Sequence, residues 1–243
     1  KFHGDLSPVN RELRDIFLAD KSQDFLNYWG HIFEEYVGIL LKQYFGVENV
    51  FRIEENDYPG KKADWIAIAE KSTILIVECK SSLLPFGVRM TFEENGFQDW
   101  IMENFVSGIE QLFSTEYLLI SNRLKIKFDA KDKTILKIIV TYENLYFIES
   151  IWKDIIRRYM SDISLNIKYP KVSNNFYTMH ILELELLEEV VAKHSFKEII
   201  DIKENKKLTF FNVFKEIEKT KLSNRLLKDI ENKFFSKFIG EIT

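Results

Sequence analysis

The sequence of 243 residues predicts an α/β protein, in which a helix–strand sandwich on a small mixed sheet is followed by a C-terminal helical extension. Apolar residues recur at intervals of three and four across 25–45, which is the period of an amphipathic helix. Three short extended stretches follow at 49–54, 63–69 and 73–80. Only 9 Gly and 4 Pro are present, which favours long helices over a barrel of many strands.

The elements follow one another in an order typical of a layered α/β sandwich. The stretch 73–77 is apolar on both faces, which predicts a central strand covered by helices on each side. A polar loop at about 81–94 leads to a second long helix at about 95–118, and a strand near 134–141 and a helix near 147–160 come next. The first 160 residues therefore run α-β-β-β-α-β-α.

We expect a core at residues 1–160 and a mainly helical extension at 161–243. Residues 161–175 are polar and predict a connector, and 176–181 predict one more strand. Helical patterns follow near 182–194, 196–203, 209–219 and 223–239. The pattern fits a separate domain and an integral helical cap equally well.

Composition excludes several classes of protein. With 46% hydrophobic and 30% charged residues, the chain is neither disordered nor of low complexity. Its single cysteine excludes a disulfide framework and a thiolate metal cluster, and fits a reducing, cytoplasmic compartment. No apolar run approaches the roughly 18 residues that cross a bilayer, so we expect no membrane partner. Because the chain begins at Lys1 without Met, we expect a piece of a longer protein.

The net charge of −4 counts mildly against a surface that binds nucleic acid throughout. It does not exclude a local basic rim around an acidic metal site.

The pattern most suggestive of chemistry is Asp64 together with Glu78-Cys79-Lys80. An acid two residues before a lysine occurs five times, at Glu78, Asp129, Asp201, Glu204 and Glu231. Only Glu78 ends a hydrophobic strand, and only Glu78 has an aspartate about 14 residues earlier, at a distance that a hairpin can close.

This spacing predicts a site for a hard metal ion. In a strand, Glu78 and Lys80 project to one face and Cys79 to the other, where it packs as a small apolar residue. Two neighbouring carboxylates repel each other unless a cation lies between them, and Mg²⁺ prefers such oxygen ligands. Lys80 can then polarise water or stabilise the negative charge of a phosphodiester transition state. The alternative is a surface hairpin with a Glu–Lys pair, which a strand apolar on both faces disfavours.

A third carboxylate lies on the first predicted helix. On a helical wheel that starts at Phe33 and advances roughly 100° per residue, Glu34 falls at the edge of the apolar stripe, whereas Glu35 falls near 200° on the far side. Glu34 is therefore either a ligand at the seam between helix and sheet or a solvated flank, and the pattern leaves both open.

Together, Gly30-x-x-x-Glu34 on a helix, Asp64 on the second strand and Glu78-Cys79-Lys80 closing the third resemble the PD-(D/E)XK nuclease superfamily, over about residues 25–145. The resemblance implies the restriction-endonuclease-like αβββαβ fold and a metal-dependent nuclease that hydrolyses DNA phosphodiester bonds. It suggests an endonuclease in phage defence or DNA processing. Ala63 replaces the residue commonest before the aspartate, at a position that varies within the superfamily.

The same resemblance implies roles for individual residues. Asp64 and Glu78, with the backbone carbonyl of Cys79, would ligate Mg²⁺ or Mn²⁺. Glu34 would add a ligand or orient water, and Lys80 would be the catalytic lysine.

Gln111 occupies about the position of a glutamine found on the second core helix of some members of the superfamily. A wheel centred on Ile109, however, puts Gln111 at about 200°, opposite the stripe of Phe105, Leu112 and Phe113. The resemblance therefore implies a catalytic role that the wheel opposes.

Positive charges close to the motif are candidates for binding substrate phosphates, namely Lys61, Lys62 and Arg89. Their alternative is ordinary solvated loop charge. The four histidines show no ligand spacing, which argues against a histidine metal site. The expected partners are DNA and a homodimer or a larger multi-domain assembly. The alternative function is a catalytically inactive nuclease-fold module that binds nucleic acid or protein.

Overall fold

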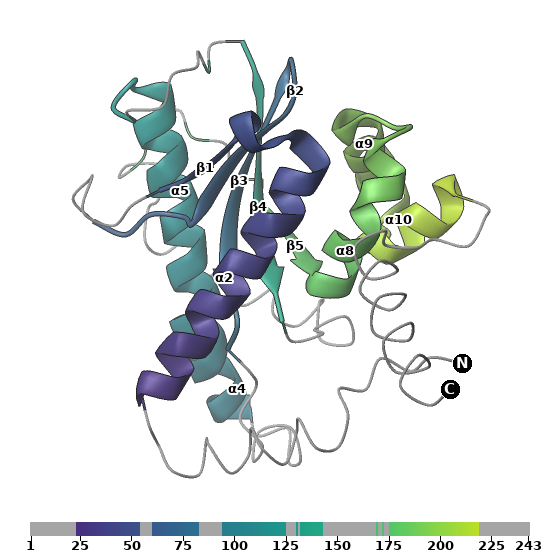
Figure 1. The fold of residues 1–243 in the computed structure, drawn as a ribbon. Helices are drawn as coiled ribbons and strands as arrows, with labels where there is room; N and C mark the ends of the chain where they lie inside the picture. Colours follow the sequence, from purple (N-terminus) through teal and green to yellow (C-terminus); the bar gives the residue numbers. More distant parts are fainter. Residues whose placement is uncertain are drawn as a thin grey trace, which may run out of the picture.

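The computed structural model describes residues 23–53, 60–82, 94–124, 130, 132–142, 169, 172 and 175–218, which form an α/β protein with a five-stranded mixed sheet (Figure 1). The elements are, in chain order, α2 (Gln23–Phe45), a 3₁₀ turn η1 (Val47–Asn49), β1 (Val50–Arg52), β2 (Trp65–Glu70), β3 (Thr73–Lys80), α4 (Glu94–Ile101), a π-helical turn η3 (Met102–Val106), α5 (Ser107–Ile120), β4 (Thr134–Thr141), β5 (Tyr177–His180), α8 (Ile181–Val191), α9 (Phe196–Lys206) and α10 (Phe210–Ile217). Among these helices, none is both long and apolar enough to span a bilayer.

The sheet has the spatial order β1-β2-β3-β4-β5, with β3 at its centre. The first three strands form an antiparallel meander, whereas β4 runs parallel to β3 and β5 runs parallel to β4. Every residue of β3 is paired with β4, from Thr73 opposite Thr134 to Lys80 opposite Thr141. The prediction of a central strand at 73–80, apolar on both faces, is confirmed because Thr73 to Cys79 are all buried.

Helices cover both faces of the sheet (Figure 1). Helix α2 and the C-terminal helices pack on the face that receives Leu75, Val77 and Cys79. Helices α4 and α5 pack on the opposite face, which receives Ile74 and Ile76. Alternate residues of β3 therefore enter two separate hydrophobic cores, as the pleat requires.

Most predicted elements agree with the observed ones. The helix at 25–45 and the strands at 73–80 and 134–141 are confirmed within two residues. Gly46 ends α2 with a φ of 87°, a conformation that favours glycine. The helix at 95–118 is one helical segment, with the π turn η3 between α4 and α5. The helices near 147–160 and 223–239, and nearly all of the connector at 161–175, lie outside the described residues.

The described part of the extension is joined to the sheet and the core. Strand β5, at the position predicted for 176–181, pairs with β4. Helix α8 lies along α2, where the Tyr36 hydroxyl donates to Glu185 at 2.7 Å and Gln43 donates to Glu188 at 2.9 Å. The division expected near residue 160 falls outside the described residues and stays a prediction.

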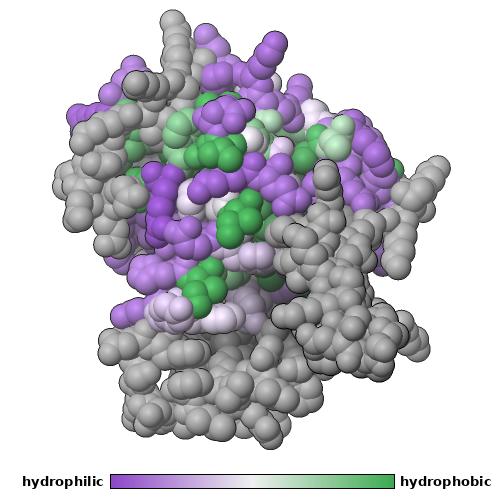
Figure 2. Space-filling view, in the orientation of Figure 1, coloured by the Kyte–Doolittle hydropathy of each residue, from purple (hydrophilic) through white to green (hydrophobic). Residues whose placement is uncertain are grey.

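The coloured part of the surface in Figure 2 is mostly hydrophilic, with smaller apolar areas among the polar ones. The described large apolar side chains with the greatest exposure are Tyr28, Ile32, Ile39, Val47 and Leu182. Scattered apolar residues of this kind are normal on a protein surface.

Helix α2 approaches the sheet closely at Gly38. A Cβ at this position would overlap the ring of Trp65, which is 2% exposed and donates from its indole nitrogen to the Glu34 carbonyl at 3.1 Å. At Gly30, two turns earlier in the same helix, the nearest atom to a Cβ would be Ser81 Oγ at 3.7 Å, an ordinary contact.

We therefore expect opposite effects of two glycine substitutions in α2. Gly38→Ala should destabilise the fold by roughly 1–3 kcal/mol, because the packed Trp65 must move. Gly30→Ala should stabilise it by about 0.5 kcal/mol, because alanine loses less backbone entropy in a helix. Urea unfolding measures both free energies, and equal effects would contradict the close approach at Gly38.

Candidate functional site

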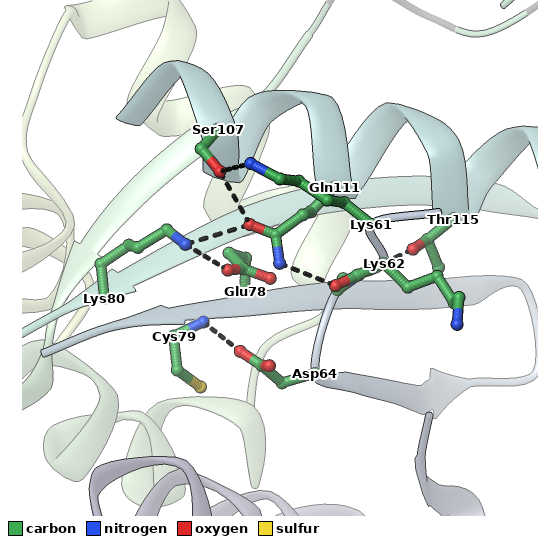
Figure 3. Close-up of polar contacts among 10 residues, drawn as sticks. Lys61, Lys62, Asp64, Glu78, Cys79, Lys80, Ser107, Gln111 and Thr115 are labelled. Carbon is green, nitrogen blue, oxygen red and sulfur yellow. Dashed lines mark hydrogen bonds and ion pairs between the residues drawn. The ribbon is translucent and has the colours of Figure 1, made fainter. Parts of the chain in front are cut away.

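The candidate site lies where the C-terminal end of β3 meets α5 (Figure 3). Glu78 is 1% exposed and points toward α5, whereas Cys79 points to the other face of the sheet, as the strand period predicts. A Cβ at Gly108 of α5 would lie 2.9 Å from Lys80 Cε and 3.3 Å from Glu78 Cγ. The absence of a side chain at Gly108 therefore gives room for both site residues beneath the helix.

Lys80 makes two contacts inside the site. Its Nζ donates to Glu78 Oε1 at 2.6 Å and to Gln111 Oε1 at 3.1 Å. The side chain of Lys80 is 17% exposed, so most of it is withdrawn from solvent. A charge in such surroundings interacts more strongly than one in water.

The second oxygen of Glu78 has no compensating partner. Among the described residues, the buried side-chain polar atoms without a hydrogen bond are Trp29 Nε1 and Glu78 Oε2. Burial, followed by the charge of Asp64, raises the pKa of the Glu78 carboxyl well above its usual range, although Lys80 opposes this shift. An unpartnered carboxylate oxygen is costly to bury, so Glu78 Oε2 is a place where a cation would stabilise the protein.

Asp64 lies directly before β2 and is held on both sides by the sheet. Its N–H donates to the Val77 carbonyl at 3.1 Å, and its carbonyl accepts from the Ile53 N–H at 3.0 Å. Its Oδ2 accepts from the Cys79 N–H at 2.7 Å. Burial and then the charge of Glu34 raise the pKa of Asp64 to about 6, despite this hydrogen bond and the charge of Lys80.

Glu34 of α2 contributes to the field at the site from its edge. The negative charge of Glu34 raises the pKa of both Asp64 and Glu78. Its Oε2 accepts from Arg52 Nη2 at 3.2 Å, and its side chain is 23% exposed. The position predicted for Glu34, at the border of the buried stripe, is confirmed, whereas its role as a ligand stays a prediction.

The helical wheel was wrong about Gln111. Gln111 Oε1 accepts from Lys80, and its Nε2 donates to the Lys62 carbonyl at 2.9 Å, so the side chain lies inside the site. The wheel assumed that the most apolar stripe, centred on Ile109, faces the sheet. In the structure the buried stripe of α5 is wider than that and also includes Gly108 and polar Thr115, so Gln111 lies at its edge.

The basic residues near the motif have different environments. Lys61 is exposed and donates to Ser107 Oγ at 3.0 Å, whereas Lys62 is 9% exposed and so is not a solvated loop charge. Arg89 lies outside the described residues. The substrate-binding roles of Lys61, Lys62 and Arg89 stay predictions. Burial also raises the pKa of the Cys79 thiol well above its usual range, which makes Cys79 a poor nucleophile.

Three further residues of α5 shape the site without having been predicted, namely Ser107, Gly108 and Thr115. Ser107, Gln111 and Thr115 recur every four residues and so form a polar row on a helix that is otherwise largely apolar. This polar row is the feature of the sequence that could have identified Ser107 and Thr115 as site residues.

The donors at the site fit a hard divalent cation in their chemistry. Asp64 and Glu78 offer carboxylate oxygens, one of which has no partner, and both groups have raised pKa values that a cation would relieve. Within the described residues, no three acidic, histidine or cysteine side chains are already arranged to hold a metal ion. A complete shell would therefore need oxygens beyond these two side chains, from water, backbone or substrate.

Comparisons with protein-family models, with curated proteins and with solved structures found no match to this chain.

The raised pKa of Asp64 predicts how the stability of the metal-free protein depends on pH. Because the folded state holds this proton up to about pH 6 and the unfolded state loses it near 4, the stability should fall as the pH rises through this window. Asp64→Asn keeps an oxygen for the Cys79 N–H and removes the charge. We expect it to raise the free energy of unfolding by about 1–2 kcal/mol at pH 7 and by little at pH 4.

Urea unfolding at both pH values measures this difference. Asp99→Asn, at an exposed position of α4, is the matched control and should change the stability at neither pH. An Asp64→Asn protein no more stable than the wild type at pH 7 would show that Asp64 is not strained by its charge.

Proposed function

We propose that the protein is a metal-dependent nuclease that hydrolyses phosphodiester bonds in DNA, of the endonuclease type. The observation that carries this proposal is the buried, unpartnered oxygen of Glu78, placed beside Asp64 and within a hydrogen-bonded group that includes Lys80. An arrangement that buries like charges without compensating them all is typical of functional sites.

The order of elements supports the proposal. Helix α2 is followed by the antiparallel strands β1, β2 and β3, then by α5 and by β4, which runs parallel to β3. This is the order of the restriction-endonuclease-like fold that the motif resembles. It also explains why the motif residues meet, because the hairpin of β2 and β3 brings Asp64 to the end of β3 where Glu78 and Lys80 lie.

Each side chain has a role that follows from its position. Asp64 and Glu78, with the Cys79 carbonyl, would hold Mg²⁺ or Mn²⁺, which when bound supplies a Lewis acid for the phosphate and for water. The Lys80 ammonium, fixed between Glu78 and Gln111, can donate to the attacking water or to the charge that develops on the phosphate. Gln111 orients Lys80, and Glu34 adds negative charge from the edge.

Two observations favour the second candidate, a nuclease-fold module without activity. Within the described residues no three-residue metal cluster is assembled, and Lys80 already neutralises one oxygen of Glu78. Such a module would bind nucleic acid or protein through the same fold without retaining a metal ion at Asp64 and Glu78.

We expect the protein to cut supercoiled plasmid DNA with Mg²⁺ or Mn²⁺ and to stop when EDTA is added. Lys80→Ala should lower the rate by about 10²–10³-fold, because a donor to the developing charge is lost. Lys206→Ala is the matched control, since Lys206 also follows an acid by two residues but lies exposed on α9. Circular plasmid reports internal cuts, and a Lys80→Ala protein that cuts at the wild-type rate would rule out the assigned role.

Calorimetric titration with Mn²⁺ separates the nuclease from the inactive module. The nuclease should bind Mn²⁺ in a way that Asp64→Asn or Glu78→Gln abolishes, since each removes a charged ligand. Glu204→Gln, an exposed acid on α9, is the control and should bind as the wild type does. No binding that depends on Asp64 and Glu78 would favour the module.

A further inference from the structure

We propose that Thr115 is a positioning residue for Asp64, acting from α5 through the peptide bond between Lys62 and Ala63; this inference rests on the proposed function. The Ala63 N–H donates to Thr115 Oγ1 at 2.9 Å, and Gln111 Nε2 donates to the Lys62 carbonyl at 2.9 Å (Figure 3). Two side chains one helical turn apart thus bind both polar groups of a single peptide. We call Gln111 and Thr115 the α5 clamp.

The clamped peptide lies where the chain enters the site. It precedes β2, which begins at Trp65. Side chains of α5 therefore make the hydrogen bonds to this peptide that a neighbouring strand would otherwise make. The next peptide already belongs to the sheet, because the Asp64 N–H donates to the Val77 carbonyl at 3.1 Å. Held by α5 on one side and by β3 on the other, the backbone fixes the direction in which the Asp64 carboxylate leaves the chain.

Burial makes the Thr115 contact difficult to replace. Thr115 is fully buried and Ala63 is 1% exposed, so no solvent reaches the Ala63 N–H from the surface. If the hydroxyl were lost, the chain would have to shift to satisfy this N–H or leave it unpaired. A shift at Ala63 would move Asp64, whose Oδ2 accepts from the Cys79 N–H at 2.7 Å. It would also change the position of the Asp64 carboxylate relative to Glu78.

The clamp also links the two halves of the site. Because Gln111 Nε2 faces the Lys62 carbonyl, the amide oxygen is turned toward Lys80 Nζ at 3.1 Å. One face of α5 therefore sets the approach of Asp64 and the orientation of Lys80 together. Groups that orient metal ligands in this way typically change metal affinity by about 10–100-fold when removed.

The first test needs no metal. In the metal-free full chain, the Thr115→Val protein should exchange the Cys79 amide proton about tenfold faster than the wild type, because its acceptor Asp64 has moved. Thr115→Ser keeps the hydroxyl and should restore the wild-type rate. Asp64→Ala gives the reference for complete loss of the acceptor, and nuclear magnetic resonance measures the exchange.

The second test measures Mn²⁺ binding by calorimetry. Thr115→Val should weaken Mn²⁺ binding by about tenfold, and Thr115→Ser by less than about threefold. Ile109→Val, a fully buried change on the same helix, is the matched control because it removes a core methyl group without touching the clamp. If Thr115→Val does not fold, Thr115→Ala, which also removes the hydroxyl that accepts from the Ala63 N–H, takes its place in both tests.

The outcomes separate this inference from the proposed function. An unchanged Cys79 amide in the Thr115→Val protein would overturn the inference, as would an Ile109→Val protein that loses protection and Mn²⁺ affinity equally. If the wild type binds no Mn²⁺ while Thr115→Val still releases the Cys79 amide, the positioning of Asp64 by Thr115 stands and the nuclease proposal fails.

Discussion

The Glu78 carboxylate, buried at the end of the central strand, governs the electrostatics of the candidate site. Its strand is covered on both faces, so the carboxylate is withdrawn from water by the same packing that stabilises the sheet. Lys80 compensates one oxygen and leaves the other without a partner. A carboxylate in this state favours protonation or a cation, and the neighbouring charge of Asp64 strengthens that tendency.

A second buried acid on the same face of the sheet differs from Glu78 in how its charge is compensated. Glu116 of α5 accepts from Lys137 of β4, and both residues are buried among the side chains between α5 and the sheet. Each charge has an opposite charge beside it, so the two charges compensate each other. Glu78 lies in the same layer but shares its lysine with Gln111 and keeps an unpartnered oxygen. The contrast is between an ion pair whose two charges compensate each other and a buried carboxylate with one oxygen that has no partner.

Helix α5 covers the sheet and also contributes residues to the candidate site. Gly108 leaves room for Glu78 and Lys80, Gln111 accepts from Lys80, and Thr115 accepts from the backbone just before Asp64. On the other face, α2 brings Glu34 to the edge of the site and is itself braced by α8 through Tyr36. The candidate site is thus shaped by helices on both faces of the sheet, α5 on one face and α2 on the other.

Those features of the site that depend on local geometry could be predicted from the sequence. The period of two placed Glu78 and Lys80 on one face of a strand and Cys79 on the other, and a short hairpin was enough to bring Asp64 beside them. The tertiary structure alone decided how α5 is rotated about its axis, because that rotation follows from packing against residues 30 or more positions away. For this reason the wheel misplaced Gln111, Thr115 went unnoticed, and the pairing of β5 with β4 emerged only in three dimensions.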